Sequence, residues 1–69
     1  MLLLEVGNKI KKRRNELGLT QSNLARMAEV SLNTLYLLES GRLNASLKTL
    51  EKISDVMGLE INLEVKKLK

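Results

Sequence analysis

The stretch TQSNLARMAEVSLNTLYLLESG, residues 20–41, decides the fold of this chain, because its pattern encodes two short helices joined by a tight turn. Thr20 and Ser31 each stand where an N-cap is needed, since a hydroxyl there accepts a hydrogen bond from a free backbone N–H of the first helical turn. We therefore expect helices over residues 21–28 and 32–39. Two helices separated by about three residues must cross at roughly 90–120°, as in a helix-turn-helix.

Two further helices are predicted on either side of this pair. Residues 6–17 form the first, with Val6, Ile10 and Leu17 at core-facing spacings, although Gly7 leaves its beginning uncertain. Residues 47–57 form the last, capped by Ser46. The apolar stripe expected to pack on the core in this last helix is Leu47, Leu50, Ile53 and Met57. Glycines 18, 41 and 58 each fall just past a predicted helix end, which favours a four-helix domain.

The end of the chain changes its hydrophobic period from that of a helix to that of a strand. Its alternating apolar positions, which we expect to form a dimer interface, are Leu59, Ile61, Leu63 and Val65. A single strand leaves its backbone groups unpaired, so it needs a partner. An antiparallel pair with the same strand of a second subunit is favoured because it supplies two-fold symmetry. The apolar segment 1–4, a fold-back on the same domain and a strand of another protein remain alternatives.

Composition excludes several classes of function. With 69 residues the chain makes one domain, near the size where one core gives only about 3–5 kcal/mol of stability, so a deep catalytic cavity is not expected. The chain contains no Cys and no His, which removes disulfides, thiolate nucleophiles, imidazole bases and the usual zinc sites. No paired carboxylates or Gly-rich phosphate loop are found. We expect a cytoplasmic protein that is not an enzyme, spans no membrane and uses no cofactor or metal.

Positive charge is concentrated in the first predicted helix. The net charge is +4, and Lys9 with the run KKRR at 11–14 places five cations within six residues. Lys11 and Lys12 fit a solvated helix face and phosphate contacts about equally well, and contacts are favoured only if this face lies beside the recognition helix. Arg14 lies on the same side of its helix as Ile10, so we expect it to point inward.

The joint spacing of four segments resembles the Cro and phage-repressor helix-turn-helix family, also called the XRE family. These segments are LTQSNLA (19–25), VS (30–31), LESG (38–41) and SLKTLEKISDVMGL (46–59). The resemblance implies an all-α, four-helix, lambda-repressor-like DNA-binding domain over residues 1–59. Residues 60–69 would add a single C-terminal β-strand that pairs across a dimer, together with a basic tail. That strand resembles the antitoxin branch of the family, in which the partner toxin is a kinase.

The same resemblance assigns residues that hold the domain and anchor it to DNA. Arg14 and Glu39 match a structural ion pair between the first helix and the end of the third. Glu29 stands where the family usually has glycine in the turn, and a left-handed backbone there would cost about 1–2 kcal/mol. The candidate phosphate contacts are Gln21, Ser31, Ser40, Arg42 and Asn44.

Base contacts are expected from the exposed face of the third helix. The candidates are Leu32, Asn33, Thr34, Tyr36 and Leu37. Asn33 has the groups for bidentate bonding to adenine, while Leu32 and the Thr34 methyl fit thymine methyl groups. Phage repressors have polar residues at the positions of Leu32 and Leu37, so shape readout gains weight here, although an exposed leucine is also ordinary on a surface. Tyr36 fits a phosphate contact or a cover for the core edge.

These observations predict a sequence-specific repressor that binds a palindromic operator on double-stranded DNA as a homodimer. A toxin partner would make it an antitoxin. A protein-interaction module that uses the same fold without DNA is the alternative from another class, and salt-sensitive duplex binding would separate the two.

Overall fold

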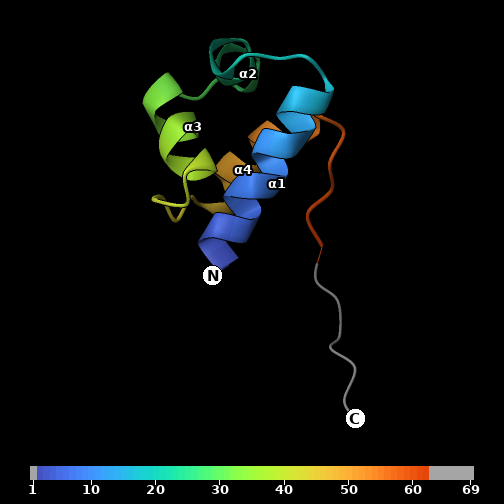
Figure 1. The fold of residues 1–69 in the computed structure, drawn as a ribbon. Coiled ribbons are helices and arrows are strands. Elements are labelled where there is room, and N and C mark those ends of the chain that lie inside the picture. The colour runs from blue at the N-terminus through green and yellow to red at the C-terminus, as the bar shows by residue number, and fades with distance from the viewer. Residues whose placement is uncertain (1, 63–69) are drawn as a thin grey trace.

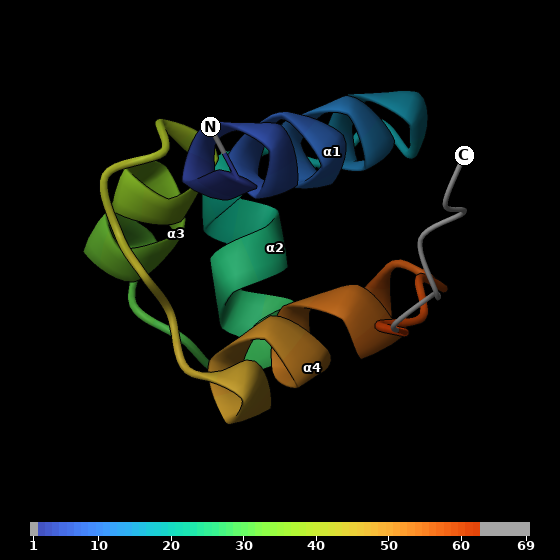
Figure 2. The same ribbon diagram turned by 90° about the horizontal axis from the view of Figure 1, so that it is seen from below.

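The computed structural model describes residues 2–62, and these form four helices without a strand (Figure 1). They are α1 (Leu2–Glu16), α2 (Gln21–Ala28), α3 (Leu32–Glu39) and α4 (Leu47–Val56). The central helix α2 packs against both α3 and α4, and α1 packs against α3. Figure 2 shows α1 and α4 on opposite sides of α2. The expected all-α fold is therefore confirmed for these residues.

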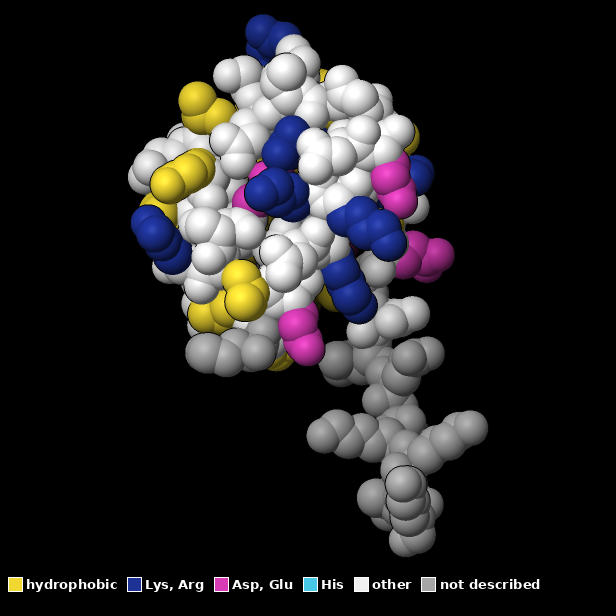
Figure 3. Space-filling view, viewed as in Figure 1, with side chains coloured by type: hydrophobic (Ala, Val, Ile, Leu, Met, Phe, Trp, Pro, Cys, Tyr) yellow, Lys and Arg dark blue, Asp and Glu magenta, His cyan; other side chains and the backbone are white. Residues whose placement is uncertain are grey.

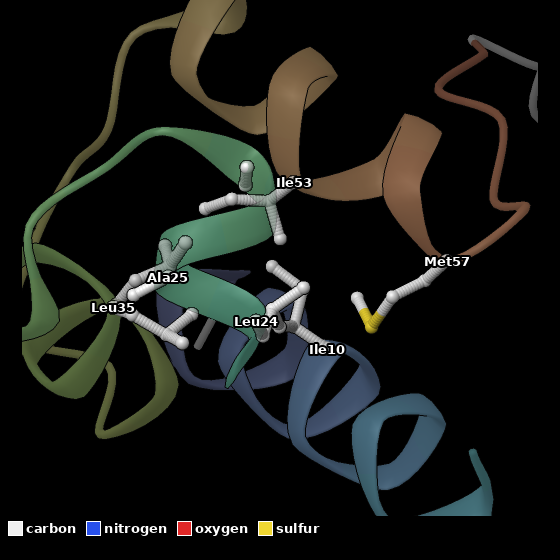
Figure 4. Packing of buried hydrophobic residues seen from close by; sticks show 8 residues of the cluster. Ile10, Leu24, Ala25, Leu35, Ile53 and Met57 are labelled. Atoms are coloured by element: carbon white, nitrogen blue, oxygen red, sulfur yellow. The ribbon is translucent and has the colours of Figure 1, made fainter. Parts of the chain in front are cut away.

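One hydrophobic core joins all four helices, and its central members come from α2 (Figure 4). Its members are each at most 4% exposed: Ile10, Leu24, Ala25, Ala28, Leu35, Leu38, Ile53 and Met57. Ala25, 3% exposed, lies beside Leu35 of α3, so its small side chain lets the two helices of the central pair approach closely. The core therefore fixes the orientation of α3, which is the helix expected to contact DNA.

The helices α2, α3 and α4 begin with the same capping device. The hydroxyls of Thr20, Ser31 and Ser46 accept hydrogen bonds from the backbone N–H three residues later, at 3.0 to 3.1 Å. At Thr20 the capping box is complete, because its own N–H donates to Asn23 Oδ1 at 3.3 Å. This box forms although residue 23 is Asn rather than the usual Glu or Gln. The Asn23 carbonyl oxygen accepts this bond as a Gln side chain would.

The first helix is longer than its sequence pattern predicted. It begins at Leu2 rather than Val6, so the alternative of a strand in segment 1–4 is wrong for Leu2–Leu4. Gly7 is buried inside the helix, where an added Cβ would lie 2.8 Å from the carbonyl oxygen of Glu39. Gly7 therefore marks the close approach of α1 to α3 rather than a helix end. Leu17 lies just past the end of α1 and is 42% exposed, so the expectation that it faces the core was wrong.

The turn between α2 and α3 passes through a left-handed residue. Glu29 has φ 58° and ψ 44°, and its N–H donates to the carbonyl oxygen of Arg26 at 3.2 Å. The N–H of Val30 reaches back to the Ala25 carbonyl oxygen at 3.0 Å, as in a helix end of the Schellman type. The turn thus keeps its left-handed geometry although it has no glycine.

The last helix and the chain after it differ in part from expectation. Leu50, Ile53 and Met57 face the core, but Leu47 is 68% exposed because it is the first residue of α4 and its side chain lies outside the packed layer. Leu59 packs against the core, and residues 59–62 form neither helix nor strand. The expected interface residues Leu63 and Val65 lie outside the described residues. None of the described helices is long and apolar enough to cross a membrane.

Candidate nucleic-acid interface

The end of α3 is fixed to α1 by a buried ion pair. Arg14 Nε donates to Glu39 Oε2 at 2.7 Å, and a second guanidinium nitrogen donates to Oε1 at 3.0 Å. Arg14 is 9% and Glu39 4% exposed. Hydrogen bonding to Glu39 and the charge of this carboxylate raise the pKa of Arg14 above its ordinary value, although burial opposes the shift. The structure thus brings the two predicted partners together in bidentate geometry, which fixes orientation as well as distance.

The same carboxylate also holds the start of α2. Gln21 Nε2 donates to Glu39 Oε1 at 3.0 Å, and a third Arg14 nitrogen donates to the carbonyl oxygen of Leu19 at 2.8 Å. One network therefore joins α1, the loop before α2, the first turn of α2 and the end of α3. The link from Gln21 to Glu39 was missed by sequence reasoning, since nothing in their spacing of eighteen residues reveals it.

The candidate base-contacting residues on α3 fall into two groups. Leu32, Asn33 and Tyr36 are exposed, and the side chain of Asn33 makes no hydrogen bond to any of residues 2–62. Thr34 and Leu37 are half-buried, so a smaller part of each side chain faces solvent. About half of the Tyr36 surface is exposed, at 48%. The first group is therefore accessible from solvent without a rearrangement of the helix.

The candidate phosphate contacts differ in whether their donors are free. Ser31 donates its hydroxyl proton to Thr34 Oγ1 at 2.7 Å, and Ser40 donates to the Leu37 carbonyl oxygen at 3.0 Å. Because a phosphate oxygen only accepts, these two hydroxyls must first break an internal bond. Arg42 and Asn44 are exposed in the loop after α3, and Arg42 forms no salt bridge within residues 2–62. Gln21 donates one of its two amide protons to Glu39, and its second amide proton makes no hydrogen bond within residues 2–62.

The basic residues of α1 make different contacts. In Figure 3 several Lys and Arg side chains lie over α1 on one face of the molecule. Arg13 Nε donates to the Met57 carbonyl oxygen at 2.9 Å and so caps the C-terminal end of α4. Sequence reasoning missed this contact, although Arg13 follows Ile10 by three positions and so lies near the core side of the helix.

The two exposed lysines of the run also face different neighbours. Lys12 lines a groove between α1 and α4, which is away from α3, so the solvated-face interpretation is favoured for it. Lys11 lies one turn from both Gly7 and Arg14, the residues of α1 that contact α3. A phosphate contact therefore stays open for Lys11.

Comparison with known proteins agrees with this geometry. The family model described as helix-turn-helix matches residues 10–63. An immunity repressor protein of Bacillus phage phi105 is 39% identical over 59 residues, which are 86% of this chain and 41% of that protein. An uncharacterised HTH-type transcriptional regulator of Methanothermobacter thermautotrophicus is 41% identical over 51 residues, or 74% of each chain.

The chain thus spans less than half the length of the phage repressor that it matches. The family match covers all of α2, α3 and α4 and the part of α1 from Ile10 onward, and so includes the whole candidate interface. The packing of α2 against α3, the capped turn between them and this match together show that the chain belongs to the helix-turn-helix family.

Proposed function

We propose that this chain is a DNA-binding transcriptional regulator, a repressor that binds a palindromic operator as a homodimer and reads it with α3. The observation that carries the proposal is the exposed face of α3, which presents Leu32, Asn33 and Tyr36 on a helix held at both ends. Its beginning is capped by Ser31, and its end is held through Glu39. The similarity to a phage immunity repressor and to an HTH-type regulator supports this class of function.

Base recognition is assigned to the first turns of α3. Asn33 is exposed and can bond N6 and N7 of adenine in the major groove, where its two polar groups match the donor and acceptor of the base. Leu32, 49% exposed, provides an apolar surface for a thymine methyl group. With few hydrogen-bonding readers on this face, sequence-dependent DNA shape supplies a larger part of the discrimination.

Anchoring to the sugar–phosphate backbone is assigned to groups on both sides of α3. Arg42 and Asn44 lie in the loop that follows it, and the second amide proton of Gln21 is held in place by the bond from Nε2 to Glu39. With about 4–8 phosphate contacts per dimer, log affinity should fall with log salt by roughly 0.9 per contact. Such contacts position the protein, while the residues of α3 supply its base preference.

Two α3 helices of a dimer would enter successive major grooves about 34 Å apart on one face of the duplex. An operator that overlaps a promoter would then be closed to RNA polymerase. This is the simplest route from the binding geometry to repression, because it needs no contact other than that of the dimer with DNA.

Selection of the purified protein on a randomised duplex library at about 150 mM salt tests the proposal, since surface electrostatics are then screened to about 8 Å. We expect enrichment of a palindrome with half-sites about one helical turn apart. A failure to enrich any sequence, with weak binding that depends only on salt, would reject a sequence-specific regulator. It would favour the protein-interaction module instead.

An antitoxin role is a narrower form of the proposal. Its support is the alternating sequence pattern of residues 59–66, although residues 59–62 form no strand and Leu63 to Lys66 lie outside the described residues. Co-purification of a kinase-like protein encoded beside this gene would support the role, and an isolated gene would count against it.

A further inference from the structure

We infer that the groove between α1 and α4 is the surface on which a second copy of this chain packs. The inference rests on the proposed function in one respect, the homodimer, and it identifies which face of the domain makes that dimer. The groove has a volume of about 480 Å³. The apolar side chains that line it are Val6, Ile10, Leu50, Leu59 and Ile61. Ile61 is 46% exposed, so the apolar lining continues to the outer edge of the groove.

This groove lies apart from the candidate DNA interface. Figure 2 shows α3 at one end of the molecule and the segment after α4 at the other, beside the ends of α1 and α4. None of the candidate base or phosphate contacts lines the groove. A partner that occupies it therefore leaves the face of α3 free for DNA.

The two edges of the groove carry opposite charges. The α1 edge carries Lys9, Lys12 and Arg13, together with Glu16, which pairs with Arg13 at 3.4 Å. On the other side, a smaller hollow of about 220 Å³ adjoins the groove and shares Leu59 and Ile61 with it. The acidic residues of that edge are Glu51, Asp55 and Glu60.

Such a surface is its own complement. When two copies meet through a two-fold axis, the same patch is used on both, and residue i of one copy faces residue j of the other. The basic edge of each copy then lies against the acidic edge of its partner, and the apolar linings meet in the centre. Opposite charges at both edges fix the orientation of the pair and reject wrong orientations. An unrelated partner would have to reproduce both edges, whereas a second copy has them already.

A charge exchange across the groove tests this arrangement. In the acidic variant, Lys9→Glu and Lys12→Glu make both edges negative, and in the basic variant, Glu51→Lys and Asp55→Lys make both edges positive. All four residues are exposed, so neither variant disturbs the core. Sedimentation equilibrium should show self-association weakened by more than about tenfold in each variant, because like charges then face each other. An equimolar mixture should recover a heterodimer, since each edge again meets its opposite.

A matched control changes the same charges elsewhere. Arg26→Glu with Lys48→Glu alters net charge as the acidic variant does, but neither residue lines the groove, so self-association should remain. Ile61→Asp should weaken self-association without unfolding the domain, since Ile61 is half exposed. A wild-type protein that stays monomeric, or a mixture of the two variants that stays monomeric while the wild type dimerises, would overturn the inference. A monomeric wild type would also contradict the homodimer of the proposed function, whereas a failed charge exchange alongside an enriched palindrome would reject the groove alone.

Discussion

At the scale of single residues, the buried pair of Arg14 and Glu39 shows how one contact can serve both stability and function. Its carboxylate accepts bonds from α1 and from Gln21, so the orientation of a predicted phosphate contact depends on a residue that faces the interior. A buried pair is costly to desolvate, and its benefit lies in bidentate geometry and full hydrogen bonding. Among the described residues no buried side-chain nitrogen or oxygen lacks a partner, which satisfies that condition.

Removal of Arg14 alone should therefore be more damaging than removal of both partners. Arg14→Met strands the Glu39 carboxylate and should cost about 3–5 kcal/mol, which is comparable with the whole stability expected of a domain this small. Arg14→Met combined with Glu39→Leu replaces both charges with apolar groups, so it should recover part of the loss. Urea unfolding followed by circular dichroism gives both free energies. A double variant less stable than either single variant would contradict this account.

Deprotonation of Arg14 should weaken the pair only in strongly alkaline solution, because its pKa is raised above the ordinary arginine value. A group whose pKa is raised on folding contributes stability that is fully present below its unfolded pKa and is lost as pH rises through the folded value. The pKa of Arg14 has its ordinary arginine value in the unfolded chain and lies above that value in the folded protein. Arg14 therefore stays charged near neutral pH. Its deprotonation should not change the difference in free energy of unfolding between the wild type and Arg14→Met in this range.

Glu29 offers a gain in stability at the turn. It has a φ of 58°, at which a side chain with a Cβ is strained. Glu29→Gly removes this strain and should stabilise the domain by about 1 kcal/mol, although the greater conformational entropy of glycine in the unfolded chain opposes part of the gain. A thermal melt should show a rise of a few degrees, since about 1 kcal/mol moves the midpoint by roughly 4–8 °C at this size. Glu29→Ala is the control, because it removes the charge but keeps the Cβ. An equal gain in both variants would assign the effect to charge.

Base and phosphate contacts should separate when single residues are changed in binding assays. Asn33→Ala should relax preference at one base position, at a cost of about 1–3 kcal/mol for the preferred site only. Arg42→Ala should weaken all sequences alike and reduce the salt slope by about one contact. Binding of both variants to the selected operator and to single-base changes of it gives the comparison. If both variants lowered only overall affinity, the division between α3 and the loop after it would be wrong.

At the scale of helices, the capping pattern made three helix starts predictable, because Thr20, Ser31 and Ser46 each precede an apolar period of the helical type. The start of α1 was not predictable in the same way. Gly7 left the beginning uncertain because glycine weakens a helix interior, yet α1 continues through it to Leu2 and Gly7 lies where α3 crosses. Local propensity could not explain Gly7, because the requirement for a small residue comes from a contact with a distant segment.

Gly7→Ala tests this explanation directly. Alanine favours a helix over glycine by about 1 kcal/mol, so propensity alone predicts a more stable protein. The added Cβ would instead meet the carbonyl oxygens of Leu38 and Glu39, which are backbone atoms that cannot turn away. We expect a loss of about 1–3 kcal/mol, as for other overpacked sites. Asn8→Ala is the matched control, because Asn8 is exposed on the same helix. Urea unfolding should place the two variants on opposite sides of the wild type.

At the scale of the whole molecule, the core positions of the first and last helices followed from the sequence, because apolar periods locate Ile10, Ile53 and Met57 without knowledge of the contacts. Leu47 and Leu17 were wrongly predicted to face the core. The apolar periodicity extends to the ends of the helices, where no neighbouring helix covers these two side chains. The polar network could not be predicted in full, because Gln21 and Glu39 come together only when α2 and α3 cross. The groove between α1 and α4 was also hidden, since its two edges come from opposite ends of the chain.

A rigid dimer makes one prediction that belongs to no single residue or helix. If two α3 helices are held at a fixed separation, an insertion of about 5 bp between the half-sites turns them to opposite faces of the duplex. Affinity should then fall towards that of a single half-site, because the second α3 can bind only if the DNA twists or the dimer opens. The measurement is a titration of the selected operator, with and without the insertion, at one salt concentration. The Ile61→Asp variant is the control for this titration. Once the dimer is weakened, the two operators should bind almost equally, and a spacing effect that persisted in this variant would place the dimer contact elsewhere.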